Sequence, residues 1–352
     1  MPDWLRSMQQ TYEYYIVDPA TWKDKQKLDN VISCSITRDS STETLGSATI
    51  DIGESVGECY IRAYLVTIQN GVTERHPLST TLVQTPSSRF NGKTRDISMD
   101  SYTPLLELKE NPPEIGYYIP KKTNIMNTAY LLVREHARAP VVKPECSEEL
   151  FSDFVADTSD TWLSFLSDLI ANAKYQFALD EMGRILFAPV QDTASLQPVW
   201  TYDDSNSSIL YPDLTIDHDL YGVPNVVEVI YSSGAEYYYS RVVNDDSNSP
   251  TSTVSRGREI IYRETDPSII GDPTEDKIKE RAQQLLRNLS TLEYTVSYKH
   301  GYCPVRIGDC VRLNYSRAGL NNVKAKVISQ SIECEPGCPV TETATFTMKL
   351  WG

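Results

Sequence analysis

Short runs of β-forming residues, separated by turn residues, recur along most of this chain and constrain its fold more than any other feature. Near the C-terminus, apolar and polar residues alternate in residues 292–298, 311–315 and 344–350. Because successive side chains of a strand point to opposite faces of a sheet, this alternation is typical of half-buried antiparallel strands. The 22 tyrosines agree with this, since a tyrosine ring can pack on a core while its hydroxyl stays in water. The sequence therefore predicts a mainly β fold.

The N-terminal part of the chain carries clear turn signals between strand-like runs. Asn70-Gly71 follows the run at residues 60–68 and predicts a tight hairpin, because both residues tolerate a positive φ. A second Asn-Gly pair stands at Asn91-Gly92. Short strands with frequent turns predict a small β-barrel or sandwich. Residues 1–28 show no clear period, and we expect them to pack on this domain as an N-terminal arm.

The pattern becomes helical after residue 110. Thr123 is placed to cap a helix that runs to His136. A second helix is predicted at residues 162–170, where apolar residues follow the i, i+3, i+4, i+7 spacing of a buried stripe. Alternating residues on both sides of a turn at 180–183 then predict a β-hairpin. Helices followed by a hairpin indicate a small α+β domain.

Strands return after Trp200. Residues 225–231 form a β-branched run that is expected to pair with residues 237–243 across Ser232-Ser233-Gly234. Asp272-Pro273 then predicts the start of a third helix, which ends at Leu289.

These patterns divide the chain into three predicted domains. Residues 1–109 are expected to hold the N-terminal arm and a first β-barrel, and residues 110–195 the small α+β domain. Residues 196–352 are expected to form a second β-barrel with an inserted helix at 273–289. The predicted fold class is mainly β with an α+β insertion, in which two small β-barrels flank a helix–hairpin domain.

Charge narrows the range of partners. The 33 Lys and Arg residues against 48 Asp and Glu residues give a net charge of −15. Such a chain is not expected to wrap nucleic acid, because phosphate binding draws on Lys and Arg. No apolar run approaches the roughly 18 residues of a membrane span, and residues 1–10 lack a basic segment followed by an apolar one. We therefore expect no membrane segment, and assembly in the cytoplasm.

The motifs of common enzyme classes are absent from the sequence. His136 has no second histidine four residues away, and no Gly-x-Ser-x-Gly motif is present. His76 precedes a proline and is expected in a loop. The acidic pairs Asp203-Asp204 and Asp245-Asp246 do not follow the spacing of a calcium-binding loop, so solvated loops explain them better. We expect no enzymatic activity.

Four of the seven cysteines lie close together in the sequence. Cys303, Cys310, Cys334 and Cys338 are separated by six, 23 and three residues. Four thiolates that converge from two loops could hold zinc or an iron–sulfur cluster. The alternative is that Cys310 and Cys334 fill strand positions as small apolar residues, with one disulfide formed later. The spacing lacks the tight Cys-x2-Cys pair of a zinc ribbon, so both interpretations stay open.

The order of domains resembles that of the tail-tip, or baseplate, hub family of tailed phages. Four segments carry this resemblance: LGSATI at residues 45–50, PLSTTLVQTP at 77–86, KKTNI at 121–125 and VRIGDCVRL at 305–313. NVVEV at residues 225–229 is similar to a strand of the final barrel of that family. The resemblance covers nearly the whole chain, but it rests on strand patterns and short phrases and not on an active-site signature.

Membership of this family would imply a structural function in the virion. The resemblance implies a homotrimer whose six barrels form a ring around the DNA channel, between the tail tube or distal tail protein and a tip or spike protein. The tape measure protein is a further expected partner, and DNA would pass through the lumen without specific binding. Some members of the family bind an iron–sulfur cluster on cysteines, which is relevant to the four cysteines above.

Two other classes of protein compete with this interpretation. One is a metal-dependent redox protein built around the cysteines, and the other is a monomeric β-rich module that binds a host or a carbohydrate. Bound metal with turnover would favour the first, and a monomer stabilised by sugar would favour the second.

Overall fold

Thirteen strands of the described residues join into one sheet, which contains strands from both predicted β regions. The computed structural model describes residues 2–53, 56–90, 92–93, 95–233, 236–265, 267 and 274–351. The chain divides into two units, each with its own packing. Unit 1 comprises Met1–Leu214 and Ser297–Ala344, and unit 2 comprises Thr215–Val296 and Thr345–Gly352.

Seven N-terminal strands form one part of the sheet of unit 1, in the order β3-β4-β7-β6-β5-β1-β2. All neighbours in this part are antiparallel. The strands are β1 (Gln9–Asp18), β2 (Lys23–Leu28), β3 (Val31–Asp39), β4 (Gly46–Ile52), β5 (Tyr60–Gln69), β6 (Val72–Phe90) and β7 (Arg95–Tyr102).

The hairpin predicted at Asn70-Gly71 is confirmed. These two residues connect β5 to β6, and both have positive φ, at 51° and 78°. Strand β6 is longer than expected because Pro77 does not end it. The pairing with β5 shifts by one residue at this position, and such a bulge accommodates a residue that has no N–H to donate. His76 therefore lies in a strand, and its expected position in a loop was wrong.

The expected N-terminal arm contains two strands of the sheet. Strand β1 pairs with β5 over nine residue pairs, from Gln9↔Ile68 to Val17↔Tyr60. Its period is hidden in the sequence because Tyr12, Tyr14 and Ile16 pack on the core on one face while Tyr15 stays half-buried on the other. The second Asn-Gly pair only partly lies within the described residues, since Asn91 falls outside them.

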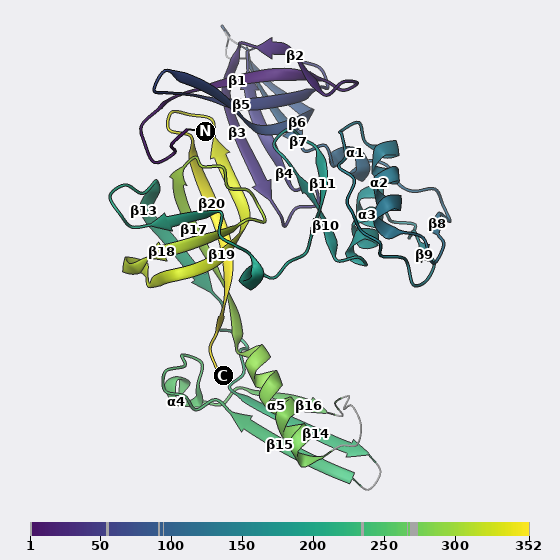
Figure 1. Cartoon of the computed structure of the whole chain (residues 1–352), viewed down its shortest axis with the longest axis vertical. Helices are drawn as coiled ribbons and strands as arrows, with labels where there is room; N and C mark the ends of the chain where they lie inside the picture. Colours follow the sequence, from purple (N-terminus) through teal and green to yellow (C-terminus); the bar gives the residue numbers. More distant parts are fainter. Residues whose placement is uncertain are drawn as a thin grey trace. The chain divides into compact units, whose positions relative to one another are not determined.

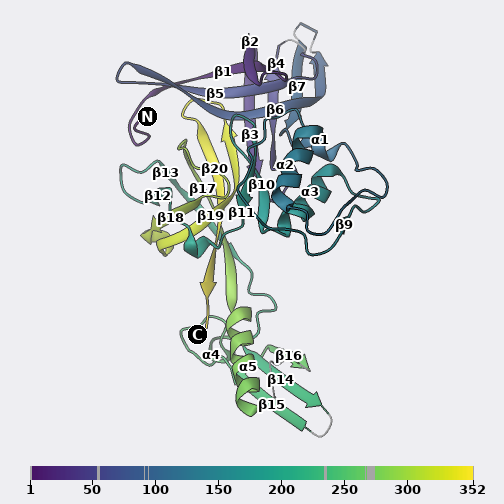
Figure 2. The ribbon, with the colours of Figure 1, turned by 45° about the vertical axis from the view of Figure 1, so that its right-hand side comes forward.

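The C-terminal strands continue the same sheet through the pairing of β19 with β3. Residues Ser329 to Glu333 of β19 pair with Asp39 to Ser35 of β3. Strands β17, β20 and β19 lie side by side beyond this junction, as Figure 2 shows. The three alternating runs predicted near the C-terminus are confirmed as β17, β18 and β20. The bounds of this group are β12 (Trp200–Asp203), β13 (Leu210–His218), β17 (Thr291–Gly301), β18 (Cys310–Tyr315), β19 (Leu320–Glu333) and β20 (Pro339–Lys349).

The middle of the chain forms the predicted helices and hairpin. Helices α1 (Leu106–Lys109), α2 (Ile125–His136) and α3 (Trp162–Ala171) pack together, and β10 (Tyr175–Leu179) pairs with β11 (Ile185–Pro189) (Figure 1). Strands β8 (Tyr118–Ile119) and β9 (Phe154–Val155) add a short pair. The Asn124 side chain caps α2 in place of Thr123, and Thr161 forms a capping box with Ser164 at α3.

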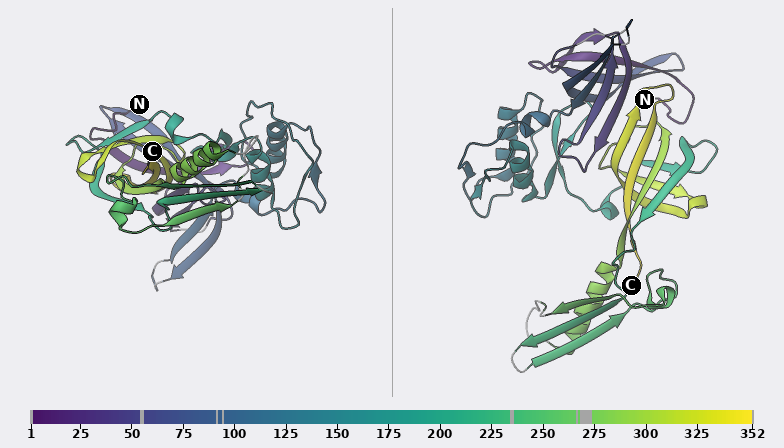
Figure 3. Two further views of the ribbon diagram at one scale, coloured as in Figure 1. Left: turned by 90° about the horizontal axis from the view of Figure 1, so that it is seen from below. Right: turned by 180° about the vertical axis from the view of Figure 1, so that it is seen from behind.

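Unit 2 contains a separate three-stranded sheet in the order β15-β14-β16. Helix α5 packs on β14 and β15 (Figure 3), with Val229, Ile278 and Leu286 in the core between them. The pairing of the two predicted runs is confirmed, but they lie in this separate sheet and not in the larger one. The bounds are β14 (Val226–Ser233), β15 (Glu236–Val243), α4 (Thr253–Arg256), β16 (Ile261–Thr265) and α5 (Glu275–Leu289).

The start of α5 differs slightly from the prediction. Thr274 accepts a hydrogen bond from the Lys277 N–H and caps the helix. Asp272 and Pro273, which were expected to start it, lie outside the described residues, as does Gly234 of the expected β14–β15 turn.

The predicted fold class is confirmed at the level of a mainly β protein with a helix–hairpin insertion. Closure of the strands into two barrels and the domain boundaries at 109 and 195 stay predictions. Within the described part of the chain, no helix has the length and apolar character needed to span a membrane.

Candidate functional site: a buried polar junction

The turn of the β10–β11 hairpin is packed against strands far from it in the sequence. Gly183 in this turn has a φ of 73°, which a residue with a side chain adopts at a cost. A Cβ atom at Gly183 would lie 2.8 Å from the Cβ of Thr80 and 3.2 Å from the ring of Trp22. The contact therefore requires glycine both for its backbone conformation and for the close approach.

Arg62 of β5 holds the same turn from inside the protein. Its side chain is 1% exposed, and its guanidinium donates to Asp24 Oδ1 at 2.8 Å, to Thr80 Oγ1 at 2.8 Å and to the Met182 carbonyl at 3.1 Å. The Trp22 indole N–H donates to the same carbonyl at 2.7 Å. A buried arginine is tolerated only with several partners, and here the turn supplies one of them.

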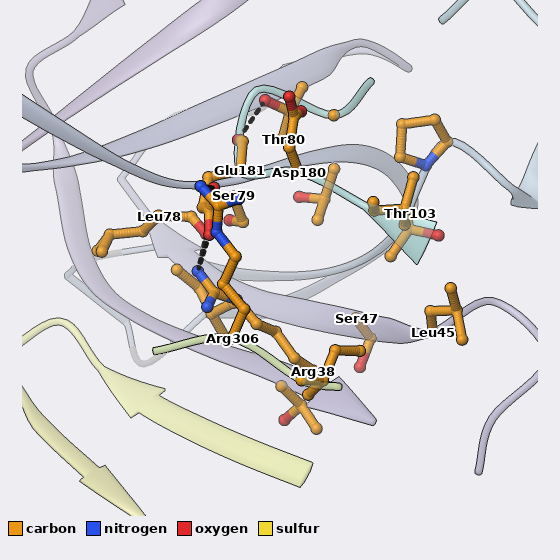
Figure 4. Close-up of a pocket in the computed structure, with 17 residues that line it drawn as sticks. Arg38, Leu45, Ser47, Leu78, Ser79, Thr80, Thr103, Asp180, Glu181 and Arg306 are labelled. Carbon is orange, nitrogen blue, oxygen red and sulfur yellow. Dashed lines mark hydrogen bonds and ion pairs between the residues drawn. The ribbon is translucent and has the colours of Figure 1, made fainter. Parts of the chain in front are cut away.

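Glu181 connects the turn to both parts of the large sheet. Its carboxylate lies 2.6 Å from the guanidinium of Arg306, which precedes β18, and 3.7 Å from that of Arg38 in β3. Figure 4 shows these side chains around a small cavity, together with the hydrogen bond from the Thr80 hydroxyl to the Glu181 carbonyl. The cavity has a volume of about 50 Å³. Ligand pockets measure roughly 300–1,000 Å³, so this is a joint between elements and not a substrate site.

Arg38 extends the junction into a second polar cluster. It donates to the Gln330 side chain at 3.0 Å and to the Leu78 carbonyl at 2.6 Å. Gln330 in turn donates to Glu342 at 2.6 Å and to the Val305 carbonyl at 3.0 Å. These groups lie on strands β3, β19 and β20, so one chain of hydrogen bonds runs across the place where the two parts of the sheet meet.

Glu342 and His300 form the centre of this cluster, and neither side chain is exposed. The His300 Nε2 atom lies 3.5 Å from Glu342 and 3.1 Å from the Tyr202 hydroxyl. Its Nδ1 atom donates to the Gly301 carbonyl at 2.7 Å. Glu342 also accepts a hydrogen bond from the Tyr298 hydroxyl. Every polar group in this cluster therefore has a partner, as buried polar groups require.

The surroundings of His300 favour its protonated form. Burial alone lowers the pKa of this imidazole, but hydrogen bonds to Cys303 and Glu342 and the charge of Glu342 outweigh it and raise the pKa to about 10. Burial, followed by the charge of Glu342, raises the pKa values of Tyr202 and Tyr298 well above their ordinary value.

A thiol, an imidazole and a carboxyl group in contact resemble a nucleophile with its base. The Cys303 Sγ atom lies 3.9 Å from His300 Nδ1 and 3.2 Å from the Tyr202 hydroxyl. The thiol, however, is only 2% exposed, and the Nδ1 atom that faces it already donates to a backbone carbonyl. A catalytic base must reach the proton that it removes, and the nucleophile must reach the substrate that it attacks. The described geometry gives these groups partners inside the protein and does not place the thiol at the surface.

The four predicted metal ligands lie in different surroundings. Cys303 contacts Tyr202, and Cys310 in β18 lies 3.8 Å from the Val311 carbonyl. Cys334 and Cys338 belong to another cluster, which also contains Cys34. No group of three or more Cys, His, Asp or Glu side chains among the described residues is arranged to hold a metal ion. The zinc or iron–sulfur site on the four thiols stays a prediction from the sequence.

The junction residues could not be identified from the sequence. Arg62, Glu181 and Glu342 belong to no motif, and their partners come from segments far away in the chain. The one signal present in the sequence is a charged residue inside an apolar strand, as Arg62 is between Ile61 and Ala63. His136, which the sequence analysis considered as a catalytic residue, lies outside this cluster. It stacks on Trp162 with ring centroids 4.2 Å apart.

Comparison with known proteins identifies the fold. No family model matches the chain, and no curated protein matches it. Among solved structures, the tail protein from Neisseria meningitidis MC58 matches with a TM-score of 0.61 and 12% identity, over 96% of each chain. The 43 kDa tail protein of prophage MuSo2 from Shewanella oneidensis matches with a TM-score of 0.62 and 11% identity, over 96% of this chain and 98% of that one.

A third match comes from a complex of two proteins. A chain of the Francisella PdpA–VgrG complex gives a TM-score of 0.54 and 8% identity, and this protein covers 54% of that chain. The first two of these matches are both tail proteins, and they define the class of fold. This protein has the fold of the phage tail proteins, and the resemblance seen in the sequence is confirmed at the level of fold.

Proposed function

We propose that this protein is a structural subunit of a phage tail tip. Three copies form a hub ring that joins the tail tube or distal tail protein to the distal tip or spike, and DNA passes through its lumen. The observation that carries this proposal is the match over nearly the whole length to two phage tail proteins. Since identity is near 12%, the match supports the fold and leaves the ring, its partners and its place in the virion as proposals.

The polar junction supports a mechanical role. Arg62, Arg38 and Glu181 connect the helix–hairpin region to both parts of the sheet through groups that are wholly or largely buried. Removing one partner of a buried ion pair is strongly destabilising, so the elements of unit 1 are held in one arrangement. A part that transmits force along a tail needs such a fixed arrangement.

The charge of the chain supports a position around DNA. A net charge of −15 gives a surface that repels phosphate. A lumen with this charge would let DNA slide past without binding. The tape measure protein would leave through the same lumen, and assembly would take place in the host cytoplasm before the tail is complete.

The proposal is tested by the solution mass of the purified full chain, measured by light scattering alone and after mixing with the tail-tube protein of the same phage. We expect three times the chain mass of 39.7 kDa for the isolated protein, or a complex that contains three copies of this chain after mixing. An unrelated β-rich protein in the same mixture serves as the control. A strict monomer under both conditions would contradict the proposal and favour the monomeric host- or carbohydrate-binding module. The metal content of the same sample tests the four-cysteine prediction, which requires stoichiometric zinc or iron.

A further inference from the structure

Two cysteines face each other where the two parts of the large sheet join. In the strand order of the described residues, β3 and β19 are the neighbours that link strands β1–β7 to the C-terminal strands. Their pairing runs from Ser329↔Asp39 to Glu333↔Ser35. One step further along, the Cys334 N–H donates to the Cys34 carbonyl at 2.9 Å. Cys34 and Cys334 are therefore directly opposite each other on adjacent antiparallel chains.

This position suits a disulfide. Residues that face each other in a hydrogen-bonded antiparallel pair have Cα atoms about 5.5 Å apart, and disulfides span Cα distances of about 4.4–6.8 Å. Side chains at directly opposed positions point to the same face of a sheet. Both thiols belong to one apolar cluster, and a hydrogen bond between them is the first of the causes that raise the pKa of Cys334.

The two thiols differ in their access to solvent. Cys34 is buried, with 4% of its surface exposed, whereas Cys334 is half-buried. A reagent therefore reaches Cys334 first. Cys338 is a competing partner for Cys334, because it lies in the same cluster, and burial followed by the nearby charge of Cys334 raises the pKa of Cys338. Cys338 is fully buried and follows a turn with positive φ, whereas Cys34 is fixed opposite Cys334 by the backbone.

We propose that Cys34 and Cys334 are a redox modification site, at which a low-molecular-weight disulfide such as oxidised glutathione converts the two thiols into a disulfide. The Cys334 sulfur, after losing its proton, attacks one sulfur of the oxidised glutathione, and one glutathione leaves as a thiolate that takes up a proton. The Cys34 sulfur then loses its proton and attacks the Cys334 sulfur of this mixed disulfide, and the second glutathione leaves. Two protein thiols are oxidised, and one oxidised glutathione is reduced to two thiols.

The modification would lock the joint of the sheet. It connects residue 34 to residue 334, so the unfolded chain would lose much of its freedom, and the folded form would gain stability. The thiolate and not the thiol attacks a disulfide, so the reaction becomes faster as pH rises. A subunit made in a reducing cell would thus acquire the crosslink only after it meets an oxidising medium.

The test uses the reduced full chain, incubated at pH 8.5 with oxidised glutathione or with a reductant, then alkylated and digested without reduction. We expect mass spectrometry to find the peptide with Cys34 linked to the peptide with Cys334 only after oxidation. The melting temperature should rise by roughly 5 °C or more in the oxidised sample.

Two variants complete the design. C34S should lose the crosslink and the rise in melting temperature, and should leave Cys334 carrying glutathione. C310S, which removes a buried thiol outside this cluster, should behave like the unmodified protein. A main product that links Cys334 to Cys338, or the absence of any peptide linking Cys34 and Cys334, would overturn the proposal. If C34S does not fold, the peptide map of the unmodified chain is sufficient to decide whether Cys34 and Cys334 become linked.

Discussion

His300 is a fully buried histidine whose partners favour its charged form. The Glu342 carboxyl group, the Tyr202 hydroxyl, the Tyr298 ring and the Cys303 thiol surround it. The pKa of His300 is raised to about 10 in the folded protein, against roughly 6.5 in an unfolded chain. The stabilisation that results is complete below about pH 6.5 and is lost as the pH rises through 10, because only the folded state still binds this proton in that range.

We therefore expect the free energy of unfolding to fall between pH 7 and pH 10, because unfolding releases the proton of His300 over this range. H300Q should be less stable at pH 7 by more than about 1 kcal/mol, because the buried Glu342 loses a partner. Its stability should also change less with pH than that of the unmodified chain. Urea denaturation at several pH values measures both. H136Q is the control, since His136 is only partly buried and stacks on Trp162. Equal pH slopes for H300Q and the unmodified chain would show that His300 does not bind this proton.

At the scale of single elements, the β10–β11 turn packs closely on the sheet at Gly183. G183A should destabilise the protein by roughly 2 kcal/mol or more, because the new methyl group meets Thr80 in addition to the strained backbone. G116A is a matched control with a φ of 79° and no atom within 4 Å of the new Cβ. It should cost only about 1 kcal/mol, the strain of the backbone alone. Urea denaturation compares the two, and equal losses would mean that the contact with Thr80 relaxes without cost.

The same turn shows how far the sequence predicts the structure. The hairpin at residues 175–189 and helix α3 were predicted correctly, because their signals are local: an alternating run, a turn and a stripe of apolar residues. Strand β1 was missed because its aromatic residues lie on both faces and hide the period. No local pattern could predict the packing of Met182 against Arg62, since this depends on segments 120 positions apart.

The cysteines show that contacts between distant segments could not be predicted from local patterns at the candidate site either. Their spacing suggested that Cys303, Cys310, Cys334 and Cys338 converge. In the structure the residue opposite Cys334 is Cys34, which lies in another part of the chain. Sheet register decides which thiols meet, and register between distant strands is set by the packing of a whole face.

At the scale of the whole molecule, the chain contains two units with separate cores. The core of unit 2 consists of Val227, Val229, Ile278, Ala282 and Leu286, and that of the helix–hairpin region in unit 1 includes Phe165 and Leu166. A core substitution destabilises the elements that contact the substituted residue. Its effect on the free energy of unfolding is independent of substitutions in distant elements. Each unit should therefore lose its protection against hydrogen exchange without the other.

We expect L286A to raise amide exchange in α5, β14 and β15 while α2 and α3 keep their protection. The side chain of Leu286 is fully buried, and removing it leaves a cavity that costs about 2–5 kcal/mol in such cores. L166A is the matched control, because Leu166 is equally buried in α3 and should give the reverse pattern. Strands β13, β17 and β20 are left out of the comparison, since each has residues in both units. Exchange mass spectrometry on the full chain measures the two patterns. Loss of protection in both units from either substitution would mean that they unfold together.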